Sequence, residues 1–190
     1  MLGAVAGRIM AKRPSNRDRN LWTVELLQLQ PHHRVLEIGC GPGLALEACA
    51  SKLSEGCAVG VDHSATMIGQ ANARLREAVK RGRVELRLEG LELLEQLERK
   101  PFDRIFSVNV VQFLPDKTAA FRSILAALAS GGVAATTYQP RNQAPTREDA
   151  LRMAREISRT MNEAGFVDMR IEELPIKPVP AVCVLGRRPK

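Results

Sequence analysis

Short apolar segments alternate with helix-like segments along most of this 190-residue chain, and this alternation is what most limits its fold. Five apolar runs have the length of buried strands, and the stretches between them have helical periodicity or end at glycine or proline. This order is typical of a sheet with helices on both faces. The predicted strands are 34–38, 58–61, 84–88, 105–108 and 133–138, and the predicted helices between them are 44–53, 65–81, 91–98 and 115–128.

The last part of the chain departs from the alternation. Thr146 is expected to cap a helix over 147–164, and two strands, 166–174 and 181–186, follow with only a proline-rich turn between them. A parallel return needs a dozen or more residues, so these two strands are expected to be antiparallel. The predicted fold is therefore a three-layer, doubly wound, Rossmann-like α/β sheet of seven strands, mostly parallel, with an antiparallel last strand.

The first 30 residues precede the alternation. Basic residues outnumber acidic ones in 1–19, which would also suit a transit peptide, but apolar residues recur there at roughly helical spacing. Residues 22–29 have the periodicity of a helix that ends before Pro31. We expect residues 1–30 to form a helical lid or arm and residues 31–190 to form the functional domain.

The amino-acid composition limits the kinds of molecule that this protein is expected to bind. The net charge of +7 permits attraction to phosphates or other acidic partners, but five Phe, one Trp and one Tyr are few for a surface that binds single-stranded nucleic acid. No apolar run is long enough to cross a membrane. The four cysteines have no CxxC spacing, so we expect no metal site. We expect the protein to be cytoplasmic, with its thiols reduced.

A glycine-rich loop follows the first predicted strand. Residues 37–43 read EIGCGPG, and glycines at three alternate positions let the backbone bend and leave room for a ligand. A dinucleotide fingerprint would need a further glycine where Leu44 stands. Glu37 would repel a pyrophosphate but suits an amino group, and Asp62 ends the second strand where an acid can accept ribose hydroxyls. This combination points away from NAD.

These segments resemble the class I S-adenosylmethionine-dependent methyltransferases, in particular small single-domain members of the type 11-like kind. VLEIGCGPG at 35–43 looks like their first motif, and 60–67 looks like their second. The segment 102–114 resembles the fourth-strand motif, and 129–133 resembles the segment before the fifth strand. The resemblance covers 31–186 and implies a methyltransferase with S-adenosylmethionine as its cofactor.

The resemblance also implies which residues bind the cofactor. Glu37 would orient the first loop or receive the methionine amino group through water, and Asp62 would accept both ribose hydroxyls. Many relatives have an acid after the third-strand glycine, but here Leu91 follows Gly90, so backbone groups or a neighbouring glutamate would recognise adenine. The full set comprises the loop, the start of the helix after the second strand, and the ends of the third and fourth strands: Glu37, Gly39, Cys40, Gly41, Gly43, Asp62, His63, Met67, Gly90, Leu91, Asn109 and Val110.

Other polar residues are interpreted as structural. Cys40 lies inside the glycine loop, where a small side chain is needed for close packing, so we do not expect it to act as a nucleophile. His32 and His33 precede the first strand, at the opposite edge of the sheet from the loop, and are expected at the surface.

Direct displacement of a methyl group mainly requires alignment of the two reactants, and no catalytic residue can be assigned from the sequence. The segment 109–112 is not the Asn/Asp-Pro-Pro-aromatic signature of enzymes that methylate amino groups of bases or glutamine, which favours a small-molecule acceptor. A methyltransferase acting on RNA or protein, and a nonenzymatic partner protein with this fold, stay open. A homodimer is possible, since the short loop 139–145 leaves the site shallow unless an arm or a second subunit covers it. Candidates for the substrate side are Trp22, Gln112, Phe113, Tyr138 and Arg141.

Overall fold

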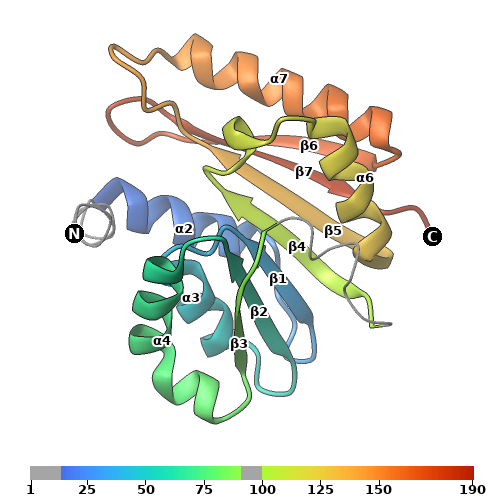
Figure 1. Cartoon of the computed structure of the whole chain (residues 1–190). Helices are drawn as coiled ribbons and strands as arrows, with labels where there is room; N and C mark the ends of the chain where they lie inside the picture. Colours follow the sequence, from blue (N-terminus) through green and yellow to red (C-terminus); the bar gives the residue numbers. More distant parts are fainter. Residues whose placement is uncertain (1–13, 91–99) are drawn as a thin grey trace.

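The computed structural model describes residues 14–90 and 100–190 (Figure 1). The helices are α2 (Pro14–Leu26), α3 (Leu44–Lys52), α4 (Ala65–Lys80), α6 (Lys117–Ala127) and α7 (Arg147–Ala164), with a short 3-10 turn at Val111–Phe113. The strands are β1 (Arg34–Ile38), β2 (Cys57–Asp62), β3 (Val84–Leu88), β4 (Phe102–Val108), β5 (Leu128–Tyr138), β6 (Val167–Leu174) and β7 (Ala181–Arg187). None of the helices in the described ranges is both long and apolar enough to cross a membrane.

The seven strands form one sheet in the order β3-β2-β1-β4-β5-β7-β6. β1 to β5 are mutually parallel, and β7 is antiparallel to both of its neighbours, β5 and β6. The predicted fold class is thus confirmed, including the antiparallel last strand. The last strand, β7, lies between β5 and β6, so β6 forms one edge of the sheet and β3 forms the other.

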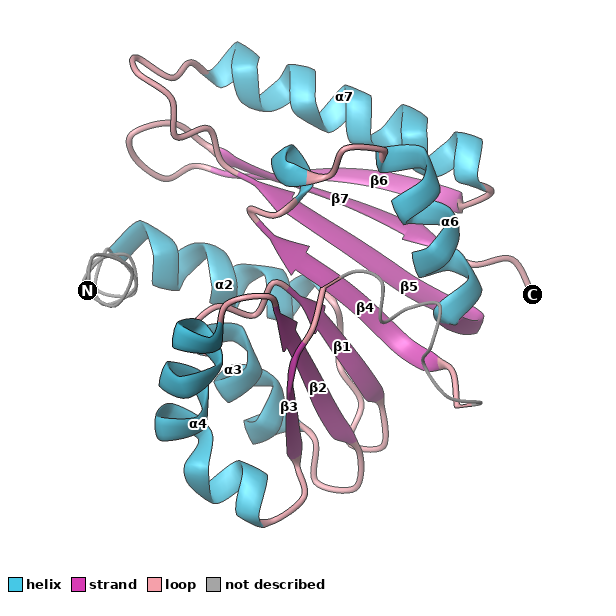
Figure 2. Ribbon diagram, in the orientation of Figure 1, coloured by secondary structure: helices cyan, strands magenta, loops and turns pink. Residues whose placement is uncertain are grey.

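Helices cover both faces of the sheet (Figure 2). Neighbouring strand residues point to opposite faces, so Leu36 and Ile38 pack with α6 and α7, while Val35 packs with α2, α3 and α4. Each central strand is therefore apolar on both sides. This explains why the strands are continuous apolar runs in the sequence.

The chain reverses its winding direction at β1, which lies between β2 and β4. From β1 the chain runs outward through β2 to β3, then crosses back to add β4 and β5 on the other side. The connections diverge at this point and leave a crevice beyond the carboxyl ends of β1 and β4, which is where ligands bind in open α/β sheets.

Side-chain caps fix the starts of the helices that surround this crevice. Ser64 accepts a hydrogen bond from the Met67 N–H at the start of α4, and Asp116 accepts one from Ala119 at the start of α6. At α7, Thr146 and Asp149 form a reciprocal capping box.

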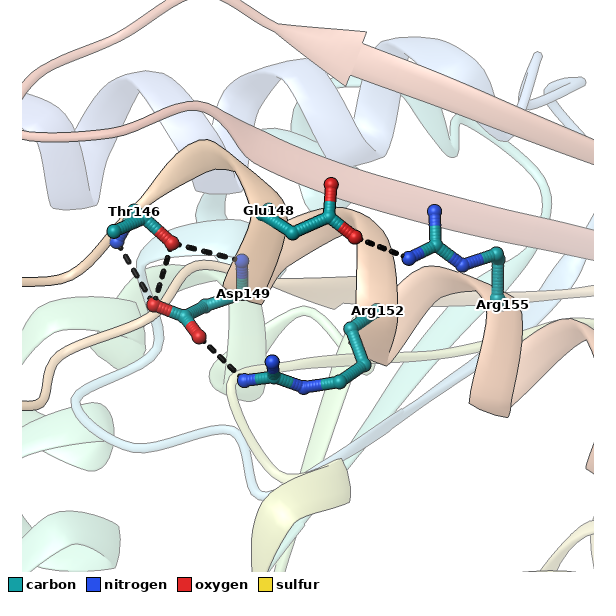
Figure 3. Close-up of polar contacts among 5 residues, drawn as sticks. All are labelled: Thr146, Glu148, Asp149, Arg152 and Arg155. Atoms are coloured by element: carbon teal, nitrogen blue, oxygen red, sulfur yellow. Dashed lines mark hydrogen bonds and ion pairs between the residues drawn. The ribbon is translucent and has the colours of Figure 1, made fainter.

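Two ion pairs continue along the first turns of α7 beyond the capping box (Figure 3). Arg152 pairs with Asp149, and Arg155 pairs with Glu148. Gly165, in the left-handed conformation, ends the helix. The ends of α7 therefore agree with those predicted from the sequence.

Several predicted boundaries were wrong at the amino-terminal side and around β5. α2 begins at Pro14 and ends at Leu26, earlier than the predicted 22–29. α6 ends at Ala127, and β5 already begins at Leu128, so the glycine pair that was expected to separate them lies within the strand. The register between β4 and β5 jumps there, and the small residues bulge out of the ladder. The predicted helix 91–98 lies outside the described residues.

His33 also differs from its prediction. It is only 6% exposed, and its Nδ1 accepts a hydrogen bond from the Gln30 N–H. Burial and the nearby Arg104 lower the pKa of its imidazole, so it is neutral at pH 7. His33 therefore closes the turn that leads into β1.

The tight turn before β2 generates a prediction about packing. A Cβ at Gly56 would collide with the backbone carbonyl of His33, so Gly56→Ala should destabilise the protein by about 1–3 kcal/mol. Gly69→Ala, within α4 where an added Cβ meets nothing within 4 Å, should instead stabilise it by about 0.5–1 kcal/mol. Urea unfolding measures both variants, and equal stability would contradict the close approach at Gly56.

Candidate active site

A cavity of about 1060 Å³ opens at the carboxyl ends of β1, β2, β4 and β5. It brings together most of the residues predicted from the sequence. Those that line it are Glu37, Gly39, Cys40, Gly41, Asp62, His63, Met67, Gly90, Asn109 and Val110 from the predicted cofactor set, and Gln112, Phe113, Tyr138 and Arg141 from the predicted substrate side. Gly43 and Trp22 are not among its lining residues, and Leu91 lies outside the described residues.

The glycine loop forms the floor of the cavity. Gly39 and Gly41 have positive φ angles of 70° and 53°, a region that L side chains rarely adopt. The N–H groups of Gly39 and Cys40 both donate to the Val61 carbonyl, at 2.8 and 2.9 Å, which ties the loop to the end of β2. A Cβ at Gly41 would meet nothing within 4 Å, so the backbone there faces open space. The loop is therefore a bare backbone cradle.

The third glycine of the loop has a packing role. Gly43 has a φ of 80°, and a Cβ there would lie 2.8 Å from Leu75 of α4. Trp22 likewise faces away from the cavity, since it packs against the core between the sheet and α2, α3 and α4. Cys40 is 4% exposed, and burial, reinforced by Glu37 and Asp62, raises the pKa of its thiol. It is therefore a poor nucleophile.

Asp62 joins the loop to the start of α4. One of its carboxylate oxygens accepts the Gly41 N–H and the other accepts the Ser64 N–H, both at 2.9 Å. The side chain is largely buried but lines the cavity, and a carboxylate has about four acceptor positions, so it can accept further hydrogen bonds. His63 is beside it, with Nδ1 3.9 Å from the Asp62 carboxylate.

Glu37 lies beneath the loop and is 1% exposed. Its Oε2 is buried and has no hydrogen-bond partner in the described part of the chain. Burial, and then the negative charge of Asp62, raise the pKa of this carboxyl well above its usual range. A cationic group at this end of the cavity would provide the missing partner and allow Glu37 to ionise.

Asn109 joins the ends of β4 and β5. Its φ is 57°, its side-chain oxygen accepts the Gln139 N–H at 2.8 Å, and its side-chain amide donates to the Gln139 carbonyl at 3.2 Å. Asn109 and Val110 belong to the cofactor set that the resemblance implies. The backbone oxygen of Asn109 accepts a hydrogen bond from the Gln112 side chain, and that of Val110 accepts one from the Phe113 N–H. Each oxygen therefore has one lone pair left for a ligand.

The end of the cavity beside β4 and β5 combines polar and aromatic groups. Gln112 Oε1 is buried without a hydrogen-bond partner among the described residues. Burial, and then the charge of Asp149, raise the pKa of the Tyr138 phenol, so it stays protonated at neutral pH. Phe113 is 77% exposed at the rim. Within the described ranges, no group of three or more His, Cys, Asp or Glu side chains could hold a metal ion.

Sequence reasoning missed the part of the cavity wall that α2 supplies. Asn16, Arg19 and Asn20 line the cavity, as does Gln139 at the end of β5. Arg19 is 1% exposed; the sequence predicts a helical lid or arm over 1–30 but does not single out this residue. The apolar periodicity that predicts this helix begins at Trp22, after Arg19, so no signal in the sequence places Arg19 at a site.

Comparison with known proteins agrees with this geometry. A family model described as "Methyltransferase domain" matches residues 36–134. An uncharacterised methyltransferase of Bacillus subtilis, YdaC, is 31% identical over 191 residues, covering 97% of this chain and 98% of the relative. A trans-aconitate 2-methyltransferase of Variovorax paradoxus is 31% identical over 113 residues, covering 60% of this chain but 41% of the relative.

Solved structures share the fold. The N-methyltransferase NodS from Bradyrhizobium japonicum has a TM-score of 0.73 at 18% identity, with 94% of this chain and 99% of that chain covered. Phosphoethanolamine N-methyltransferase 2 from Haemonchus contortus, in complex with S-adenosyl-L-methionine, has a TM-score of 0.69 at 18% identity. The match covers 91% of this chain and 53% of that chain.

The fold and the bare glycine cradle between two acids define a Rossmann-like enzyme that binds a nucleoside. The chain belongs to the methyltransferase-domain family, of the class I type, and S-adenosylmethionine is its cofactor. The residues present fit this cofactor. The Gly41 backbone leaves space for it, Asp62 could accept ribose hydroxyls, and the Glu37 oxygen that has no partner among the described residues could receive the positively charged amino group.

The buried Glu37 carboxyl predicts a characteristic pH dependence, because burial and the charge of Asp62 outweigh the one backbone hydrogen bond that it accepts from Leu46. In the unfolded chain a glutamate ionises near its usual pKa of about 4.5, whereas the folded protein holds Glu37 protonated well above that pH. The folded state therefore binds more protons, and stability is lost as pH rises above about 4.5. Glu37→Gln should remove this loss, so the variant should be more stable than the parent at pH 8 by about 1 kcal/mol or more, and the difference should shrink towards pH 5.

Urea unfolding at pH 5 and pH 8 without cofactor measures this difference. Glu77→Gln, an exposed glutamate on α4, is the matched control and should show no such trend. Glu37→Gln should also weaken cofactor binding despite its greater stability. A variant that is less stable than the parent at pH 8 would contradict the prediction.

Proposed function

We propose that this enzyme transfers a methyl group from S-adenosylmethionine to a small-molecule acceptor by direct in-line displacement, with the acceptor held between the ends of β4 and β5 and the wall formed by α2. The cavity itself carries this proposal. Its volume of about 1060 Å³ lies at the upper end of what one drug-sized ligand occupies, and its lining continues past β4 to Tyr138, Gln139 and α2. That leaves room for a second small molecule beside the cofactor.

When bound, the cofactor supplies an electrophilic methyl group whose transfer disperses the positive charge of its sulfur. The protein's task is to hold the acceptor atom about 3–3.5 Å from that methyl group and in line with the sulfur. Gln112 Oε1 is suited to accept an N–H or O–H of the acceptor, because it is buried on the cavity wall without another partner. The Tyr138 phenol, which stays protonated, is suited to donate a hydrogen bond.

The names of two relatives support a small acceptor: the trans-aconitate 2-methyltransferase of Variovorax paradoxus, and a phosphoethanolamine N-methyltransferase of Caenorhabditis elegans that is 30% identical over 173 residues. This chain spans 41% and 39% of those two relatives, so their acceptors are not assigned to it. RNA or protein as acceptor, a homodimer and a cytoplasmic location stay predictions from the sequence.

The acceptor class can be tested with S-adenosylmethionine that carries a labelled methyl group. The enzyme is incubated with a cell extract divided into solutes below 1 kDa, total RNA and total protein, and the label in each fraction is measured. We expect the label in the small solutes. Label that enters only RNA or protein would overturn the proposed acceptor class.

The Asp62 carboxylate gives a second test on the cofactor side. Asp62→Asn keeps the shape of the side chain but replaces one acceptor oxygen with an amide, so it should weaken binding of S-adenosylhomocysteine about tenfold or more. Asp168→Asn, at an exposed aspartate on β6, is the matched control and should bind like the parent. Calorimetric titration measures both, and NAD should bind to neither protein. Unchanged affinity in Asp62→Asn would contradict this role.

For the acceptor side, Gln112→Met removes the unpartnered oxygen while retaining the size of the side chain. If Gln112 orients the acceptor, the variant should lose about tenfold in kcat/KM for the small acceptor identified above, with cofactor affinity unchanged. An equal loss of cofactor affinity would instead place Gln112 at the cofactor.

A further inference from the structure

A guanidinium is buried in the cavity wall, and no carboxylate in the described part of the chain pairs with it. Arg19 of α2 is 1% exposed and lines the cavity. It donates from Nη1 to the side-chain oxygen of Gln139 and, at 2.6 Å, from Nη2 to Oδ1 of Asn16. Both acceptors are neutral amides, and Nε has no partner. Buried charges in proteins are normally paired, yet Arg19 forms no ion pair with a carboxylate of residues 14–90 or 100–190.

A second guanidinium approaches the same point. Arg141, just after β5, donates from Nη2 to the Asn16 Oδ1 that already accepts from Arg19, at 3.3 Å. Two cations thus share one neutral oxygen. Burial, and then the charge of Arg141, lower the pKa of Arg19 to about 9. An anion at this point would relieve both the loss of solvation and the repulsion.

The position of the pair separates it from Glu37 and Asp62, the two acids of the predicted cofactor set. Arg19 is bonded to Gln139 at the end of β5, whereas Glu37 is on β1, and β4 lies between those two strands. The cavity therefore has an acidic half, around Glu37 and Asp62, and a basic half at β5 and α2. The acidic half fits the amino group and the ribose hydroxyls of the cofactor. The basic half lies beyond β4 from those acids, on the side of the cavity that the proposed function gives to the acceptor.

We propose that the methyl acceptor carries an oxyanion, a carboxylate or a phosphate, and that Arg19 and Arg141 bind this group. The inference rests on the proposed function, because it assigns the second part of the cavity to the acceptor. Guanidinium groups bind such anions through paired N–H donors, and this fixes the orientation of the ligand as well as its affinity. Asn16 and Gln139 hold Arg19 in place, so Arg19 is already oriented before the anion enters.

The test uses the full chain saturated with S-adenosylhomocysteine, so that the cofactor half is filled. Citrate and inorganic phosphate are titrated calorimetrically at constant ionic strength, with triethyl citrate as an uncharged counterpart. We expect citrate or phosphate to bind and triethyl citrate not to bind. The anion that binds more tightly shows whether the site prefers a carboxylate or a phosphate. Arg141→Gln should weaken anion binding about tenfold or more, since each contact between a charged donor and an anion has roughly that effect.

Arg19→Gln should weaken anion binding at least as much, and Arg19→Lys should recover only part of it, because lysine lacks the paired donors. Arg159→Gln removes one exposed positive charge of α7 and should leave anion binding unchanged. If the Arg19 variants do not fold, Arg141→Gln still decides the question, because Arg141 is exposed.

The alternative outcomes separate the two proposals. If neither anion binds to the complex, or if Arg141→Gln binds the anion as tightly as the parent, the anion site is wrong while the cofactor site stands. If the arginine variants weaken S-adenosylhomocysteine binding and the complex excludes citrate and phosphate, the pair holds the carboxylate of the cofactor itself, which overturns the inference. If the folded parent does not bind S-adenosylhomocysteine, the proposed function fails together with it.

Discussion

The hydrogen bonds that join the end of β2 to the loop after β1 determine the shape of the site. The Asp62 carboxylate accepts the N–H groups of Gly41 and Ser64, and the Val61 carbonyl accepts those of Gly39 and Cys40. These four bonds hold a glycine backbone in a conformation that other residues rarely adopt, and they fix it relative to the start of α4. The protein's own hydrogen bonds therefore hold the cradle open, and the remaining walls of the cavity are positioned around it.

The cavity contains two buried ionisable groups, Glu37 beneath the glycine loop and Arg19 on α2, that have no opposite charge as partner among the described residues. Each one destabilises the folded protein without ligand. Arg19 is a buried charge without an opposite charge, and Glu37 must be held in its protonated form at a pH where the unfolded chain would ionise it. Groups of this kind concentrate at functional sites, where a ligand provides the partner. Their opposite signs indicate two ligand groups of opposite charge, which agrees with a cationic methyl donor and an anionic acceptor sharing one cavity.

Much of this architecture could be read from the sequence, because the central strands are buried on both faces and so appear as continuous apolar runs. The ends of α7 were predictable because Thr146 and Gly165 are local signals that need no tertiary contact. The start of β5 could not be predicted in this way, because the residues that follow Leu128 are small and bulge out of the ladder. Arg19 was missed for a different reason: its burial depends on Gln139, 120 residues away, and a basic residue in a basic segment carries no sign of such a contact.

The segments that supply the anion site and the residues of the cofactor site occupy separate stretches of the chain. The family model spans 36–134 and includes the glycine loop, Asp62 and Asn109, whereas Arg19 precedes it and Gln139 and Arg141 follow it. One half of the cavity is thus encoded by the sequence common to the family, and the other by the flanking segments that fold back over it. With the acceptor bound by Arg19 and Arg141 as proposed, mutations in those flanks would change the acceptor while the methyl donor stays the same, so that one cofactor-binding core could acquire new substrates through the segments on either side of it.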